Sequence, residues 1–323
     1  MNADDLLTAF LPALESYQTA IDTHPGGPPL LAHYTTIETM AAIMQHDEVW
    51  LSNPLFMNDH EELRLGIEFG MTISRESPDL RDACQDEECY AALRHSLEWV
   101  YKQALENNVL DYYVFCLSEH ARDDDDGLLS MWRAYGGNGN GAALVFNSTP
   151  LSGSKPPYVL LGEVRYIKRE QRVASITKVV ADFAKLFKPL SVPSLGMIDA
   201  ASILFDLLKL NSLFTKHDGF REEKEWRLVY LHERDVRQHL KSMLSYSVGH
   251  RGVEPKLKFK VGELAKATDQ RLSLFTLIDR ILLGPSVAGE LSKRSIAKML
   301  ERQGKSQLAG RLRASTIPLR PLS

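Results

Sequence analysis

Apolar residues repeat at helical spacing along much of the chain, and these repeats predict where helices lie. In the first segment they recur every three or four residues from Leu6 to Ile21, and we expect this helix to end at His24, where a loop rich in proline and glycine follows. Further helices are predicted after Thr35 and at 61–76, 79–107, 169–187, 196–214 and 287–303.

Runs of β-branched and aromatic residues predict the strands, most clearly at 111–118, where the sequence reads DYYVFCLS. Other strands are expected at 48–52, 142–146, 158–166, 220–231, 256–260 and 280–285, with a last edge strand at 316–319. These strands do not alternate regularly with helices. We therefore expect an α+β fold and not a doubly wound sheet.

The length of 323 residues favours a single domain with an elaborated helical part. Its expected parts are an N-terminal helix at 1–24, a core at 30–285 with helical insertions near 61–107 and 169–214, and a C-terminal helix and edge strand at 286–323. The oligomeric state is left open.

Composition narrows the class of protein. A net charge of -4 gives no support to a basic nucleic-acid surface, and the acidic cluster at 123–126 is expected to be a solvated loop. Three cysteines, at 84, 89 and 116, argue against a disulfide framework, and the absence of a CxxC pair argues against a structural zinc site. Without a signal peptide or a long apolar run, the chain is expected to be cytoplasmic and not membrane-bound, although a signal-free secreted effector would look the same.

His33, Tyr34 and Thr35 form the first candidate for chemistry. Thr35 precedes Glu38 by three residues, a capping-box pattern that places His33 at a strand-to-helix junction. An imidazole there can bind a ribose hydroxyl or act as an acid or base, or it can simply satisfy a turn.

Two further groups combine polar and aromatic residues. Asn58, Asp59 and Glu62 fit an Asx turn that caps a helix, or a loop that folds over a cleft. The second group, suited to stacking on a flat ring or to the core, consists of Ser118, Ser130, Trp132 and Tyr135. The glycine-rich turn at 136–141 lacks the order of a phosphate-binding loop.

The stretch GFREEKEWRLV at 219–229 holds the strongest candidate. If a strand begins near Glu225, alternation places Glu223, Glu225 and Arg227 on one side. Such charges suit a polar cleft, where a carboxylate can bind a ribose hydroxyl and stabilise a sugar cation. An exposed, charged edge strand is the alternative.

Several blocks together resemble a bacterial domain-of-unknown-function family, numbered 2971. They are HYT at 33–35, WLS at 50–52, ND at 58–59 with Glu62, FCLS at 115–118, SMW at 130–132 with Tyr135, Lys216 with His217, EKEWR at 223–227 and ILLGP at 281–285. The order of the candidate residues is more distantly similar to the ADP-ribosyltransferase superfamily: a histidine comes first, an aromatic residue or serine follows, and a glutamate comes last.

The superfamily resemblance implies a split, mainly antiparallel β core with NAD bound as co-substrate and no metal. His33 would then bind a ribose of NAD, Trp132 or Tyr135 would stack near nicotinamide, and Glu225 would stabilise the ribosyl cation. Arg227 and Lys216 would meet the pyrophosphate, and Tyr34, Thr35, Ser118 and Ser130 would complete the pocket. His33 and Glu225 must therefore face one hollow.

The expected function is thus an NAD-dependent ADP-ribosyltransferase or NAD glycohydrolase, as in a toxin, effector or phage-defence enzyme, with protein, nucleic acid, a small molecule or water as acceptor. One alternative is a non-catalytic module that binds a nucleotide or a protein. Another is a metal-dependent nuclease that uses Asp59, Glu62, Glu223 and Glu225.

Overall fold

In the computed structural model of the chain, the described residues form two compact units. They are residues 3–19, 21–57, 60–108, 112–152, 158–190, 192–193, 196–235, 237–249, 252–262 and 273–319. Unit 1 comprises Met1–Gln18, Asn53–Tyr112 and Gly162–Arg221, and unit 2 comprises Thr19–Ser52, Tyr113–Leu161 and Glu222–Ser323. The single domain expected at 1–323 stays a prediction, and each unit is described by itself.

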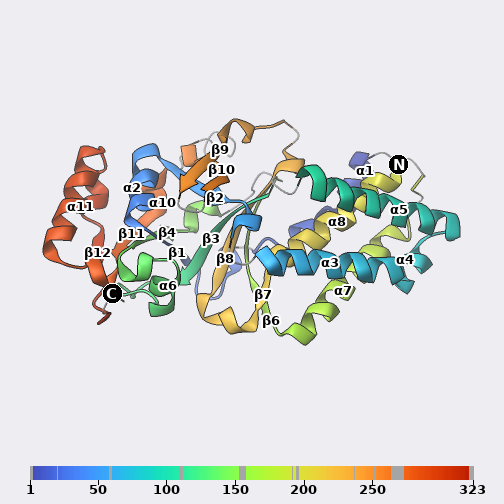
Figure 1. Cartoon of the computed structure of the whole chain (residues 1–323), viewed down its shortest axis with the longest axis horizontal. Coiled ribbons are helices and arrows are strands. Elements are labelled where there is room, and N and C mark those ends of the chain that lie inside the picture. Colours follow the sequence, from blue (N-terminus) through green and yellow to red (C-terminus); the bar gives the residue numbers. More distant parts are fainter. Residues whose placement is uncertain are drawn as a thin grey trace. The chain divides into compact units, whose positions relative to one another are not determined.

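Unit 1 is mostly helical. Its helices are α1 (Ala3–Glu15), α3 (His60–Glu76), α4 (Pro78–Ala83), α5 (Glu87–Gln103), α7 (Arg169–Phe187) and α8 (Met197–Leu213), and a parallel pair of short strands, β6 (Arg165–Ile167) and β7 (Thr215–His217), accompanies them. Helix α8 is buried along nearly its whole length because α1, α3, α5 and α7 all pack against it (Figure 1).

The contact between α3 and α8 depends on two glycines one turn apart. A Cβ atom at Gly66 would lie 2.3 Å from the Ser212 hydroxyl, and one at Gly70 would lie 2.7 Å from a methyl of Leu208. Only a residue without a side chain leaves room for so close a helix approach.

Unit 2 is built on a mixed, mostly antiparallel sheet. Its strands are β1 (Leu30–Thr35), β2 (Glu48–Ser52), β3 (Tyr112–His120), β4 (Ala142–Asn147), β5 (Val159–Glu163), β8 (Glu225–Leu231), β9 (Leu244–Gly249), β10 (Gly252–Lys260), β11 (Ile278–Leu283) and β12 (Leu312–Ala314). In the described residues the order is β12-β11-β4-β1-β3-β2-β10-β9, and β8 pairs with β3 and β5. The helices of this unit are α2 (Ile37–His46), α6 (Leu129–Ala134), α10 (Leu274–Leu277), α11 (Glu290–Arg302) and α12 (Ser306–Ala309).

Strands β1 and β2 both pair with one edge of β3, and an unpaired stretch of β3, here called the split, lies between them. Strand β1 pairs with the C-terminal end of β3, where Ala32 lies opposite Ser118, and β2 meets β3 at Val114. On the other edge of β3, the Glu119 N–H donates to the carbonyl of Lys224, which precedes β8. The backbone between Val114 and Ser118 that faces β1 and β2 therefore lacks a strand partner in the described ladder.

The two faces of the sheet differ in chemistry. One face, here called the core face, packs a large apolar cluster that includes Leu31, Phe115, Leu144 and Trp226. The opposite face, here called the α6 face, carries a smaller cluster in which Ala32, Tyr34 and Val145 contact Met131 and Trp132 of α6.

The α+β class expected from the sequence is confirmed, and most elements lie where the patterns predict them. Strand 48–52 and helix 169–187 match to the residue. Helix α2 is capped by Thr36 and not by Thr35, since the Thr36 hydroxyl accepts the Thr39 N–H at 3.2 Å. The helix predicted over 79–107 breaks in two because the Asp86 carboxylate caps a new start by accepting the Cys89 N–H.

Three other expectations were wrong. The first helix ends at Glu15 and only a short 3-10 turn, Ile21–Thr23, follows it before His24. Residues 220–223 lie in a 3-10 turn, so the predicted strand begins at Glu225, and 316–319 form no strand.

The acidic loop is more than a solvated segment. The Asp124 carboxylate accepts backbone N–H groups of Asp126 and Gly127, and Asp125 pairs with Arg280 at 2.7 Å. Asp126 binds the hydroxyl of Thr316 at 2.9 Å. The loop thereby fastens β11 and the C-terminal segment to the rest of unit 2.

Candidate functional site

The α6 face gathers a polar cluster around the start of β8. Trp226 and Tyr230 of β8 belong to the core face, so alternation turns Glu225 and Arg227 toward the α6 face. Ser118 lies on the same face, because its partner Ala32 does.

Glu223 connects three elements of this cluster. Its carboxylate accepts a hydrogen bond from the Tyr135 hydroxyl at 3.2 Å, just past the end of α6. Its carbonyl accepts the Ser118 hydroxyl at 2.6 Å, and Ser118 is 1% exposed. Lys224 follows with a left-handed φ of 42°, which turns the chain between the two glutamates. The structure therefore brings Ser118, Tyr135 and Glu223 together from segments far apart in the sequence.

Glu225 and Arg227 form a buried, bidentate ion pair. The Arg227 Nε–H donates to Oε1 of Glu225 at 2.8 Å, and its terminal nitrogen donates to Oε2 at 3.1 Å. Both residues are 5% exposed. Two parallel hydrogen bonds hold the carboxylate in one orientation, and each partner compensates the buried charge of the other.

His33 lies on the other face of the sheet. It pairs in register with Leu144 of the core face, and its ring stacks on Phe115 with 4.2 Å between ring centroids. Strand alternation therefore directs His33 and Glu225 to opposite faces of the sheet. This geometry gives no support to the prediction that the two side chains face one hollow.

His33 instead fills the split along β3, between the residues that pair with β1 and with β2. Its Nδ1 lies 2.9 Å from the Cys116 carbonyl, which can only accept, so Nδ1 carries the proton and donates. Burial lowers the pKa of His33 to about 4, against a smaller opposing effect of that hydrogen bond. The neutral ring replaces a missing ladder bond.

The aromatic residues predicted to stack on a ligand are occupied within the fold. Trp132 is fully buried, donates its indole N–H to the Asp126 carbonyl at 2.8 Å and meets Tyr34 edge to face. The Tyr34 hydroxyl accepts the Leu128 N–H at 3.0 Å, and burial raises the pKa of Tyr34 to about 12. Tyr135, which is only partly buried, is the aromatic residue of the predicted set with its polar end in the cluster.

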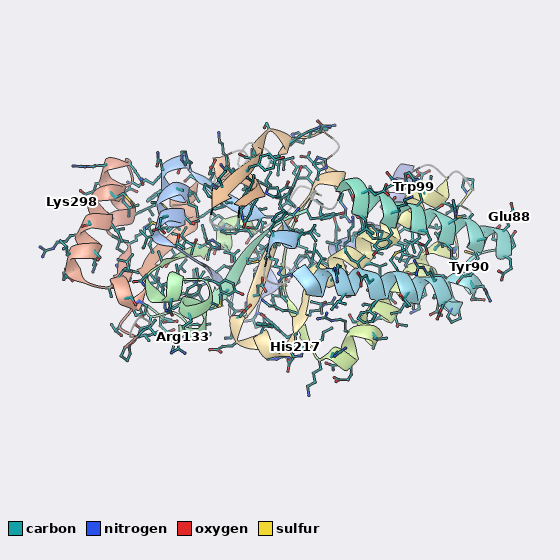
Figure 2. All side chains as sticks on the ribbon, in the orientation of Figure 1. Glu88, Tyr90, Trp99, Arg133, His217 and Lys298 are labelled. Atoms are coloured by element: carbon teal, nitrogen blue, oxygen red, sulfur yellow. The ribbon has the colours of Figure 1, made fainter. Side chains whose placement is uncertain are left out.

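Other predicted residues lie apart from this cluster in the fold. Thr35 is buried on the core face, and the Ser130 hydroxyl is buried within α6 without a hydrogen-bond partner among the described residues. Lys216 and His217 belong to unit 1, where the Lys216 ammonium lies 4.7 Å from the centre of the Phe220 ring and His217 is exposed at the end of β7 (Figure 2). Asn58 and Asp59, and the side chain of Glu62, lie outside the described residues.

A polar stripe on β2 and β10 of the α6 face was missed as a site candidate. The Trp50 indole N–H donates to Glu48 at 2.9 Å, and the Lys258 ammonium lies 4.9 Å from the centre of the Trp50 ring. Lys256 pairs with Glu254 at 3.0 Å and donates to Ser52. The alternation of polar and apolar residues at 48–52 and 256–260 is the signal that could have predicted this stripe.

Two absences can be stated for the described part of the chain. No group of three or more His, Cys, Asp or Glu side chains there is placed to hold a metal ion. No helix among the described residues combines the length and apolar character needed to cross a membrane.

The fold and the cluster define an α+β protein with a buried polar site on one face of its sheet. Residues 131–228 match the family model described as "Protein of unknown function (DUF2971)", which confirms the family resemblance for that segment. The match includes Tyr135, Glu223, Glu225 and Arg227 and leaves His33 outside. Comparisons with curated proteins and with solved structures gave no match.

Proposed function

We propose that this protein cleaves the nicotinamide–ribose bond of NAD, as an ADP-ribosyltransferase or NAD glycohydrolase, with its reactive carboxylates on the α6 face. The observation that carries the proposal is the turn Glu223-Lys224-Glu225, which places one carboxylate just before a core strand and one at its first residue. The Glu223 carboxylate accepts a hydrogen bond from the Tyr135 hydroxyl. The distant resemblance of the sequence to the superfamily adds to this support.

Cleavage of the nicotinamide–ribose bond requires the protein to orient NAD and to supply one negative charge. When the glycosidic bond breaks, positive charge develops on the ribose, and a fixed carboxylate stabilises it without reorganising. Arg227 holds Glu225 in place, while Tyr135 positions Glu223. The acceptor of the ADP-ribosyl group, whether protein, nucleic acid, a small molecule or water, is open in this proposal.

The proposal assigns His33 a positioning role. It holds the split of the sheet in shape from the core face and does not touch the sugar. Lys216, His217, Asn58, Asp59 and Glu62 receive no role here.

The test measures nicotinamide release from NAD by the wild-type protein and by Glu225→Gln. We expect the variant to lose about 10²–10³ in rate, the usual cost of one preorganised electrostatic group. Glu222→Gln is the matched control, because Glu222 is exposed and three positions from Glu225 in the same segment. Unfolding and NAD-binding measurements separate lost chemistry from lost folding, since Gln at 225 leaves Arg227 without its charge partner.

Equal release by wild type, Glu222→Gln and Glu225→Gln would reject the proposed role of Glu225. The second candidate is a non-catalytic module that binds a nucleotide or a protein. It is favoured because both carboxylates of the cluster already have partners within the protein, Arg227 for Glu225 and Tyr135 for Glu223. Binding of NAD with no nicotinamide after long incubation would select that candidate.

A further inference from the structure

Strand β9 forms one edge of the sheet of unit 2, because it pairs only with β10 among the described strands (Figure 1). Its sequence, LSYSVG, is six residues long, carries no charge and no proline, and pairs with β10 in an unbroken register. Soluble proteins protect sheet edges with charges, prolines, bulges or short strands, since free backbone groups there can pair with another strand. Strand β9 has none of these protections.

The other ends of the same sheet are protected. Strand β12, at the opposite end, contains only three residues, and one of them is Arg313. Strand β5 is covered at Leu161, whose carbonyl accepts the Thr19 N–H at 3.0 Å. An open edge is therefore a particular property of β9.

The free backbone groups of β9 belong to alternate residues. Tyr246 lies opposite Pro255 of β10. Proline has no N–H to donate, so this pair shares no hydrogen bonds, and the N–H and C=O of Tyr246 point away from β10. Alternation gives Val248 and the Leu244 carbonyl the same direction. The Leu244 N–H donates to the Lys241 carbonyl of the preceding turn, and the open edge ends there.

The side chains of these residues form an apolar strip on the core face. Leu244 packs against the core cluster opposite Leu257. Farther along the hairpin the strip leaves the core: Tyr246 is 65% exposed, Val248 is 81% exposed, and Val253, its partner on β10, is 59% exposed. Contiguous exposed apolar side chains of this kind mark interaction surfaces.

Residue types along this edge read the same in both directions. Around Tyr246 the chain has serine at 245 and 247 and an aliphatic residue at 244 and 248. We propose that the edge binds a second copy of the chain, with β9 antiparallel to β9 about a two-fold axis at Tyr246. A two-fold interface requires one surface to complement itself, and a symmetric pattern meets this requirement along the whole strand. The inference does not depend on the proposed function.

This pairing satisfies the backbone and the side chains together. Tyr246 exchanges N–H···O bonds with its counterpart, and each Val248 N–H donates to the Leu244 carbonyl across the axis. On the core face the two tyrosines lie together and each leucine lies beside a valine, while on the α6 face serine meets serine. No like charges are opposed, so the sheet continues from one copy into the next.

The experiment measures the mass of the full-length folded protein by sedimentation across a wide range of concentration. Wild type should dimerise. Tyr246→Lys should weaken dimerisation about tenfold at low salt, because two lysines then lie directly opposite each other, and Tyr246→Glu should do the same. An equimolar mixture of the two variants should dimerise again, since opposite charges meet at the axis. Val173→Lys, which changes an exposed valine of unit 1, is the control and should associate as wild type.

A cross-link tests the register. The Cα atoms of a hydrogen-bonded antiparallel pair lie about 5.5 Å apart, within reach of a disulfide. Tyr246→Cys should therefore form a covalent dimer under mild oxidation. Val253→Cys should not, because its two copies lie three strand spacings apart, at least about 14 Å. Equal cross-linking of both variants would overturn the register.

Three results would overturn the proposal itself. The first is a wild type that stays monomeric, even if it binds another protein through β9. The second is a dimer that Tyr246→Lys leaves unchanged. The third is a mixture of the lysine and glutamate variants that stays monomeric although each variant is folded.

Discussion

His33 illustrates how one side chain can complete a sheet. Where β1 leaves β3, the Cys116 carbonyl loses the donor that a neighbouring strand would supply, and the Nδ1–H of His33 takes that place. An unsatisfied buried carbonyl costs about 1–3 kcal/mol, so the hydrogen bond from the ring stabilises the split. Protonation of the ring would keep this bond but would bury an unpaired charge.

We expect this arrangement to make stability depend on pH. The pKa of His33 is lowered to about 4 in the folded protein, below the usual 6.5, so the unfolded chain binds more protons between these values. The contribution of His33 is therefore complete above about pH 6.5 and falls as the pH drops toward 4. It amounts to roughly 3 kcal/mol, because the two pKa values differ by about 2.5 and each pKa unit is worth about 1.4 kcal/mol.

Urea unfolding at pH 7.5 and pH 5 measures the effect. His33→Gln is the matched variant, because an amide can still donate to the Cys116 carbonyl but does not titrate. The variant should lose less stability than wild type between the two pH values. An identical pH dependence for both proteins would contradict the assignment.

Glu223 and Glu225 show what alternation alone predicts. The sequence correctly predicted that Glu225 and Arg227 share a face, because a strand begins at Glu225. It did not predict the left-handed Lys224, since lysine carries no local signal for a positive φ. Nor could it predict that His33 faces the other way, because the relative faces of two strands depend on which residues pair in register.

At the scale of elements, the close approach of α3 to α8 rests on Gly66. Replacing it by alanine would place a methyl 2.3 Å from the Ser212 hydroxyl and 3.0 Å from its Cβ. That hydroxyl donates to the Leu208 carbonyl at 3.0 Å and is buried, so it has little room to give way.

We expect Gly66→Ala to destabilise the protein by about 1–3 kcal/mol, more than the gain of about 1 kcal/mol in helix propensity. Thermal or urea unfolding checks this, with the exposed Thr72→Ala on the same helix as control. Ser212→Gly should recover part of the loss in a double-mutant cycle. If Gly66→Ala proved as stable as wild type, the close packing of α3 on α8 would be in error.

Elements with a strong period were predicted best. Helix α7 and strand β2 match to the residue because their apolar positions repeat without interruption. The strand predicted at 158–166 divides into β5 and the three-residue β6. Strand β7 contains three residues and β9 alternates serine with apolar residues, so neither length nor composition predicts them. The break between α4 and α5 depends on a cap by Asp86, which the longer apolar repeat concealed.

At the scale of the whole molecule, the polar cluster is built from residues that lie far apart along the chain. The cluster on the α6 face joins residues 118, 135 and 223. Residue types at those positions were visible in the sequence, but their meeting is a property of the sheet order, which crosses over several times.

The alternation of the chain between the two units has a mechanical consequence. A single cut between Lys188 and Gly196 would leave α7 on one piece and α8 on the other, and would also divide the sheet, because β1 to β5 precede the cut and β8 to β12 follow it. Each piece would then hold part of the core of each unit. We expect a molecule nicked at a protease site introduced after Val192 to run as one species in native size-exclusion chromatography and to separate only in urea. Two peaks without denaturant would show that the two pieces do not hold together. If pieces separated in urea again eluted as one peak after the urea was diluted, the two pieces could serve as a split-protein reporter.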